Sequence, residues 1–151
     1  MKRLTALICT ILCLTALAAY AERIPDGYRE TPWGTDLRKV MAEYPGGNLG
    51  RHNNDYVYRQ FNPNQEIFIR TFRFRDDKLM GVSIKFNPDY VKRRGTGRIL
   101  STYRKMFGEG AYERAPSPHV ITYTWEDAEN RISFGYTPKR PDMTIMIFEQ
   151  K

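Results

Sequence analysis

Apolar residues of this chain recur with two different periods, and the period changes at Tyr56. Before that point, four apolar residues are spaced three or four positions apart, as on one face of a helix: Leu37, Val40, Met41 and Tyr44. The sequence Pro45-Gly46-Gly47 ends the pattern. We therefore expect a short helix from Leu37 to Tyr44 and a polar loop over 48–55.

From Tyr56 onward, apolar and polar residues alternate, which is typical of strands with one buried face. Three segments rich in aromatic and β-branched residues follow one another, at 56–61, 66–75 and 78–86. Turn-forming residues separate them at Asn62-Pro63-Asn64 and Asp76-Asp77. These segments predict an antiparallel meander.

The same order of elements occurs a second time. A second helical stripe is formed by Ile99, Leu100, Tyr103, Met106 and Phe107, and strands are expected at 119–126, 131–137 and 143–149. The sequence therefore predicts an α+β fold of two tandem α-β-β-β units, at about 33–87 and 95–150. Two amphipathic helices would pack on one face of the antiparallel sheet or sheets. One continuous sheet without symmetry is the alternative.

The stretch TPWGTDLRKVM, residues 31–41, leads into the first helix. We expect Gly34 to allow a sharp turn, Thr35 to cap the helix and Asp36 to place a negative charge in its first turn. Trp33 would then fold onto Leu37 and Met41 and be mostly buried.

The first 21 residues read as a secretory signal peptide. Lys2 and Arg3 precede an apolar run from Leu4 to Ala19, and Ala19-Tyr20-Ala21 fits a cleavage site. A retained membrane anchor is the alternative, because the run is only just shorter than the ~20 residues of a spanning helix. Cleavage would leave a single domain at 22–151 and remove both cysteines, Cys9 and Cys13. It would also lower the net charge from +7 to +5 by removing Lys2 and Arg3.

The segment WGTDLRKVMAEYPGG, followed by the hairpin FRFRDDKLMGVSIKF, resembles small exported bacterial proteins that begin with Trp-Gly-Ser/Thr and a short helix. Most of these proteins have no assigned activity. The segment is also similar to the SmpA/OmlA type of outer-membrane assembly lipoprotein, in which such a unit is an interaction module. This chain departs from the second group because it has no lipid-attachment cysteine. The resemblance implies an interaction module of the cell envelope.

The titratable residues do not form a recognisable catalytic motif. His52 and His119 are 67 positions apart, and neither belongs to a nucleophile or zinc motif. We expect them in a surface loop and at a strand start. The carboxylates at Asp76-Asp77, and at Glu126, Asp127 and Glu129, are expected in solvated hairpin turns.

Two groups of basic residues are candidates for anion binding. In 66–75, Arg70, Arg73 and Arg75 interleave with Phe72 and Phe74, which could bind single-stranded nucleic acid but is better explained by arginines facing outward on an amphipathic strand.

The second group is KRRGTGR, residues 92–98, directly before the second helix. Backbone N–H groups at a helix start attract anions, and glycines allow close approach. The candidate anion site comprises Lys92, Arg93, Arg94, Gly95, Gly97 and Arg98, with Arg104 and Lys105 extending it. A solvated entry loop is the alternative.

Taken together, these patterns favour a non-enzymatic exported interaction module, in the periplasm or secondarily in the extracellular medium. Its partner would be an envelope protein or an anionic surface. Neither nucleic acid, a metal nor a cofactor is expected, and no membrane span would remain after cleavage. The alternatives are a binder of an anionic envelope component through residues 92–105, and a small hydrolase or an inhibitor of one.

Overall fold

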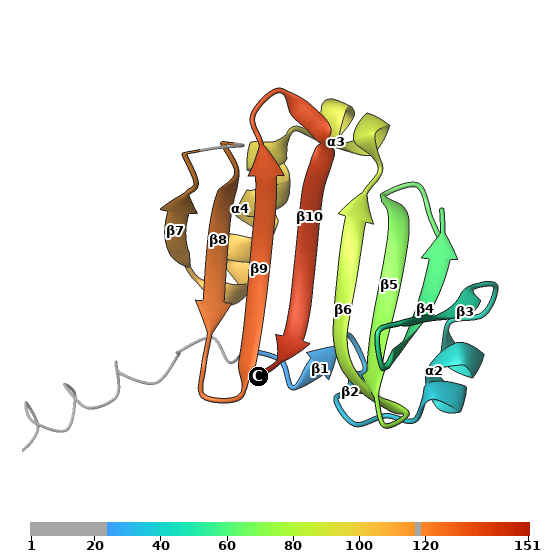
Figure 1. Ribbon diagram of the computed structural model, residues 1–151. Coiled ribbons are helices and arrows are strands. Elements are labelled where there is room, and N and C mark those ends of the chain that lie inside the picture. The colour runs from blue at the N-terminus through green and yellow to red at the C-terminus, as the bar shows by residue number, and fades with distance from the viewer. Residues whose placement is uncertain (1–23, 117–118) are drawn as a thin grey trace, which may run out of the picture.

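The computed structural model describes residues 24–116 and 119–151. These residues form one antiparallel sheet of eight strands, ordered β3-β4-β5-β6-β10-β9-β8-β7 (Figure 1). The strands are β3 (Asn48–His52), β4 (Asp55–Phe61), β5 (Ile67–Arg75), β6 (Lys78–Phe86), β7 (Ala111–Arg114), β8 (Ile121–Glu126), β9 (Asn130–Thr137) and β10 (Arg140–Gln150). The expected α+β class with antiparallel pairing is confirmed. The expected signal peptide at 1–21, with Cys9 and Cys13, lies outside the described residues.

Within the described ranges, three helices and a short hairpin accompany the sheet. The helices are α2 (Leu37–Glu43), α3 (Pro88–Arg94) and α4 (Thr96–Phe107), and the hairpin pairs β1 (Gly27–Tyr28) with β2 (Thr31–Pro32). In Figure 1, α4 lies behind β8 and β9, whereas α2 lies beside the other half of the sheet. No helix in the described part of the chain is both long and apolar enough to cross a membrane.

The core lies between the sheet and the helices. A row of apolar side chains crosses five neighbouring strands in register: Phe72, Val82, Phe148, Ile132 and Trp125. Leu37 and Val40 of α2 and Ile99 and Leu100 of α4 belong to the same buried cluster. Both helices therefore bury their apolar stripes on one face of the sheet, because alternate strand residues all point toward that face.

Besides the β1–β2 hairpin, three elements were not predicted. The expected loop at 48–55 instead contains β3, and a further edge strand, β7, precedes β8. Both are edge strands whose side chains are mostly exposed, so they lack the alternating pattern that reveals a half-buried strand. Four strands therefore follow each helical region where three were expected, and all eight join one continuous sheet. The third missed element is α3, which begins at Pro88.

The entry to α2 differs from the expected arrangement. Gly34 has a φ of +77°, as its proposed turn requires. Thr35 is not the cap, because its hydroxyl donates to the carbonyl of Pro32, and Asp36 occupies the N-cap position without a capping hydrogen bond. Instead, the Asp36 carboxylate accepts a 2.6 Å hydrogen bond from Lys78 at the start of β6. The prediction that Thr35 caps this helix was wrong.

Trp33 is partly exposed and packs against the edge of the core. Its indole N–H donates a 2.8 Å hydrogen bond to Oδ1 of Asn130, which is only 3% exposed at the β8–β9 hairpin. The Nδ2 group of Asn130 in turn donates to the Asp26 carboxylate over 2.8 Å. Trp33 therefore ties the N-terminal segment to the second half of the sheet, a long-range role that its local sequence does not reveal.

Candidate functional site

The predicted anion site at 92–98 does not form an open entry loop. Lys92, Arg93 and Arg94 lie in the last turn of α3. Positive charge is favourable there because it interacts with the negative end of the helix dipole. Gly95, with a φ of +81°, ends α3 and directly precedes α4. Gly97 and Arg98 then fall in the first turn of α4. The alternative of a solvated entry loop was also wrong, because Asn87 and Pro88 start a helix there and the Asn87 side chain accepts a hydrogen bond from the N–H of Asp89.

The basic residues of the predicted patch and of its extension along α4 contact different partners. Arg104 turns toward Tyr123, with its guanidinium carbon 4.7 Å from the ring centroid, and pairs with Glu109 at 3.3 Å. Lys92 pairs with Asp89 at 3.4 Å. Of the six residues of the predicted site, Arg94 is the one that lines a cavity described next.

This cavity has a volume of about 740 Å³ and lies on the helix face of the sheet. Its lining residues come from β1, β5, β6, α3, α4 and β10 and from the segments next to β1 and β5. Its apolar lining includes Ile67, Ile84, Phe86, Ile99, Phe107 and Phe148, of which all but Phe107 are less than 9% exposed. Met106, expected within the buried stripe of the second helix, is instead 52% exposed and lies at the cavity lining.

Six ionisable side chains also line the cavity: Tyr28, Arg29, Glu66, Tyr90, Arg94 and Tyr103. They come from both halves of the chain. Apart from Arg94, the sequence did not nominate them, because Tyr28 and Arg29 lie in a segment without periodicity and Glu66 lies at the end of a turn. A cavity with an apolar lining and a few convergent polar groups is the usual form of a small-molecule site.

The three tyrosines stay neutral over the physiological pH range. Burial raises the pKa of Tyr28 and, more strongly, that of Tyr103. Burial also raises the pKa of Tyr90, with a further contribution from the nearby Glu66 carboxylate. Tyr28 is only 2% exposed, and its hydroxyl has no hydrogen-bond partner among the described residues. A buried hydroxyl without a partner is uncommon and marks a position where a polar ligand atom would be favourable.

The expectation that the arginines of β5 all face outward was wrong for Arg70, which lies beside the Tyr28 ring. Position 70 has the same parity as Phe72 and Phe74, so Arg70 points to the helix face and is 5% exposed. Its guanidinium carbon lies 5.1 Å from the ring centroid of Tyr44 and 5.8 Å from that of Tyr28. Burial lowers its pKa, and Tyr28 partly offsets this effect. Arg73 and Arg75 are exposed as expected.

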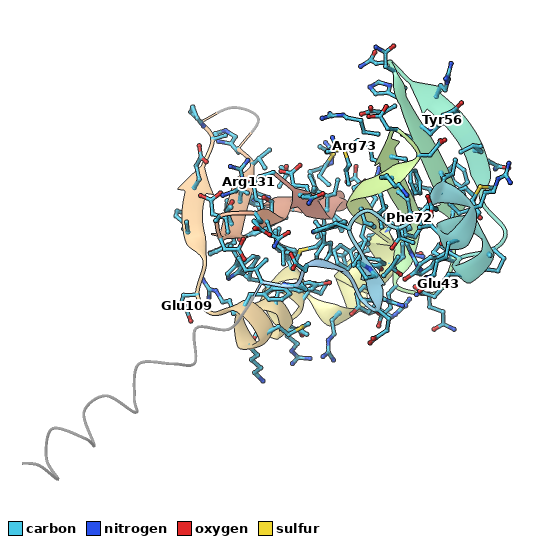
Figure 2. The ribbon with its side chains drawn as sticks, turned by 90° about the horizontal axis from the view of Figure 1, so that it is seen from below. Glu43, Tyr56, Phe72, Arg73, Glu109 and Arg131 are labelled. Atoms are coloured by element: carbon cyan, nitrogen blue, oxygen red, sulfur yellow. The ribbon has the colours of Figure 1, made fainter. Side chains whose placement is uncertain are left out.

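The opposite face of the sheet is open. Figure 2 shows Arg73 and Arg131 on that side, whereas Phe72 lies between the sheet and the helices. Glu149 lies 3.8 Å from each arginine, so charges alternate across β5, β10 and β9. A smaller hollow of about 310 Å³ on this face is lined by His52, Arg59, Arg73 and Glu149, among others.

The histidines and paired carboxylates do not converge. His52 is exposed in β3, a strand where a loop was expected, and His119 is exposed just before β8. Asp76 and Asp77 form the β5–β6 turn, and Asp127 accepts from the N–H groups of Glu129 and Asn130, which confirms the turn interpretation. Within the described ranges, no three His, Cys, Asp or Glu residues are grouped so as to hold a metal ion.

Comparison with known proteins gives one distant structural neighbour. No known protein family and no curated protein matches this chain. The crystal structure of YjgB, a DUF4309 family protein from Bacillus subtilis subsp. subtilis str. 168, is similar over 78% of this chain and 79% of that one, with 17% identity and a TM-score of 0.46. A likeness at this level carries no argument about function, which therefore has to be inferred from the site itself.

Proposed function

We propose that this protein is an exported, non-enzymatic binding module of the bacterial envelope that takes an amphipathic ligand into the helix-face cavity. The observation that supports this most is the composition of the cavity. It combines an apolar lining with three tyrosines, two arginines and one carboxylate, and six different elements contribute residues to the lining as a whole. Its volume of about 740 Å³ falls within the range of ~300–1,000 Å³ that is usual for small-molecule sites.

We infer that the two halves of the sheet are tandem units, with α2 and β3–β6 in one and α4 and β7–β10 in the other. The strand order is mirrored about the β6–β10 pair, which supports this reading. The cavity is lined by residues of β5 and β6 from the first unit and by residues of α4 and β10 from the second. A groove between two such units would then be the binding surface, and the units would have diverged to line it differently.

The basic patch contributes to this proposal through Arg94 alone. Lys92, Arg93 and Arg98 are exposed outside the cavity lining and would add only a diffuse positive field. The alternative of an anion binder that uses the whole 92–105 patch therefore has less support than binding in the cavity. The hydrolase alternative would need a base beside a nucleophile, and the two exposed histidines offer no such pairing.

Binding in the cavity can be tested with a neutral hydrophobic fluorophore, N-phenyl-1-naphthylamine, titrated into the purified protein. Thr102 lines the cavity from an exposed position on α4, so Thr102→Trp should obstruct it. We expect affinity to fall by about tenfold, ~1.4 kcal/mol. Ser101→Trp is the matched control, because Ser101 is exposed on the same helix but does not line the cavity. No saturable binding, or equal loss in both variants, would count against the proposal.

Export is tested separately. Expression in a bacterial host should release a protein whose intact mass corresponds to a chain that begins at Glu22. Retention of residues 1–21 in a membrane fraction would support the anchor instead.

A further inference from the structure

The cationic groups of the cavity lack acidic partners. Arg29 and Arg94 both line it, and no ion pair within 4.0 Å involves either of them in the described part of the chain. Arg29 instead stands over the Tyr28 ring, with its guanidinium carbon 5.5 Å from the centroid. Two arginines therefore line a cavity in which Glu66 is the single carboxylate contributed by the described residues.

A third arginine, Arg70, adds positive charge beside Tyr28 of this cavity. Its guanidinium carbon is 5.8 Å from the centroid of the Tyr28 ring, and it is likewise without an ion pair among the described residues. The Tyr28 hydroxyl is buried and has no hydrogen-bond partner among the described residues, so it can donate a hydrogen bond to a ligand. These groups favour an anionic ligand atom, since positive charge and a donor are present without a bound acceptor.

The rest of the cavity favours an apolar chain. Ile84, Phe86 and Phe148 provide a buried floor from the central strands, and Ile99 and Phe107 of α4 face the same space. Burial of an apolar chain on such a surface is favourable, and the gain increases with each methylene group removed from water. Met106 is exposed at the lining and is flexible enough to adapt to chains of different length.

We propose that the ligand is a single-chain amphiphile with an anionic head group, such as a fatty acid or a lysophospholipid. The head group lies between Arg29 and Arg94, and the chain runs over the floor formed by Ile84, Phe86 and Phe148. This inference rests on the proposed function and names the ligand class of the same cavity. The two sources differ at Glu66, because a lysophospholipid that carries an ammonium group would place a cation near that carboxylate, whereas a fatty acid would not.

The test compares ligands with the same chain and different heads, below their micelle concentrations, by isothermal titration calorimetry. Dodecanoate and dodecyl phosphate should bind at least about fivefold more tightly than glycerol monododecanoate, which is neutral, because hydrogen bonds to charged groups are stronger. Arg29→Gln and Arg94→Gln should each remove most of this preference, because they weaken binding of the anionic ligands more than binding of the neutral one. Added salt should reduce the preference as well.

Arg93→Gln is the matched control, because Arg93 is exposed in the same turn of α3 and does not line the cavity. Equal effects of Arg93→Gln and Arg94→Gln would mean that general surface charge causes the preference, and would overturn the inference. Equal affinity for neutral and anionic heads would also overturn it, but would leave the proposed function standing. If no dodecyl ligand binds, both fail. A lauroyl lysophosphatidylethanolamine arm with Glu66→Gln distinguishes the two sources, because only a zwitterionic head should respond.

Discussion

At the scale of single residues, Arg70 is the most unusual side chain of the fold. It is 5% exposed, and aromatic rings surround its guanidinium where a carboxylate would be expected. A buried charge loses hydration that cation–π contacts of roughly 0.5–2 kcal/mol each only partly replace. We infer that a buried arginine of this kind has a role in function, and the role that follows from its position is to favour an anionic ligand beside Tyr28.

The first prediction concerns this residue. Arg70→Met keeps most of the side-chain volume and removes the buried charge, so the free energy of unfolding should stay within about 1 kcal/mol of the original or rise. Urea denaturation measures it. Binding of dodecanoate should weaken in the same variant, while binding of the neutral glycerol ester should not. Destabilisation by more than about 3 kcal/mol would mean that the aromatic contacts of Arg70 outweigh its desolvation.

The second prediction concerns the Trp33–Asn130 hydrogen bond, which joins positions 97 residues apart. Trp33→Phe removes the donor and should cost about 1–2 kcal/mol, since Asn130 keeps its bond to Asp26. Asn130→Ala should cost more, because it also leaves the indole N–H and Asp26 without this partner. A double-mutant cycle in urea should show a coupling of about 0.5 kcal/mol or more. Full additivity would show that the bond contributes nothing to stability.

At the scale of elements, the β5–β6 hairpin contains a turn whose backbone conformation is unfavourable for its own two residues. Asp76 and Asp77 both have positive φ, at 49° and 60°, as a two-residue type I′ turn requires. The carbonyl of Asp77 accepts from the N–H of Leu37, so this turn also holds the start of α2. The turn was predictable from the two aspartates, whereas its contact with α2 depends on the tertiary fold.

The third prediction follows from this geometry. Asp77→Gly should raise the free energy of unfolding by roughly 0.5–1 kcal/mol, because glycine adopts positive φ without steric cost and keeps the backbone carbonyl. Thermal unfolding measures the change. Lys139 also has positive φ, at 63°, so Lys139→Gly in the β9–β10 connection is a second variant that should act in the same direction. Destabilisation by Asp77→Gly would indicate that the aspartate carboxylate has a structural role.

The fourth prediction concerns acid sensitivity of the β8–β9 hairpin. Hydrogen bonds from the N–H groups of Glu129 and Asn130 lower the pKa of Asp127, and hydrogen bonds from Lys151 and Arg131 lower that of Glu126. Groups with a lowered folded-state pKa contribute stability above their ordinary pKa of about 4, and this contribution is lost as pH falls through the lowered value. Unfolding free energy should therefore decrease below about pH 4.

Asp127→Asn isolates this contribution. Asparagine can still accept the two backbone hydrogen bonds but does not titrate, so the slope of stability against pH in the acid range should become shallower. Asp76→Asn is the control, because Asp76 is exposed in a different hairpin turn. Equal changes of slope in both variants would remove any special role for Asp127.

At the scale of the whole molecule, strong periodic patterns were predictable and weak edge patterns were not. Both helical stripes and six of the eight strands of the sheet follow from residue spacing, because burial on one face imposes the period. The edge strands β3 and β7 form because a neighbouring strand offers hydrogen bonds, which leaves little trace in their residues. The cavity could not be predicted for a similar reason: its lining comes from elements far apart in the sequence, and only Arg94 stood within a recognisable cluster.

The position of β10 has a consequence for the order of folding. The last strand of the chain lies at the centre of the sheet and pairs with both β6 and β9. Until residues 140–150 have been synthesised, β6 has no neighbour on one side, and the first half cannot join the second. A nascent chain therefore cannot complete this sheet before residues 140–150 are available to pair with both β6 and β9.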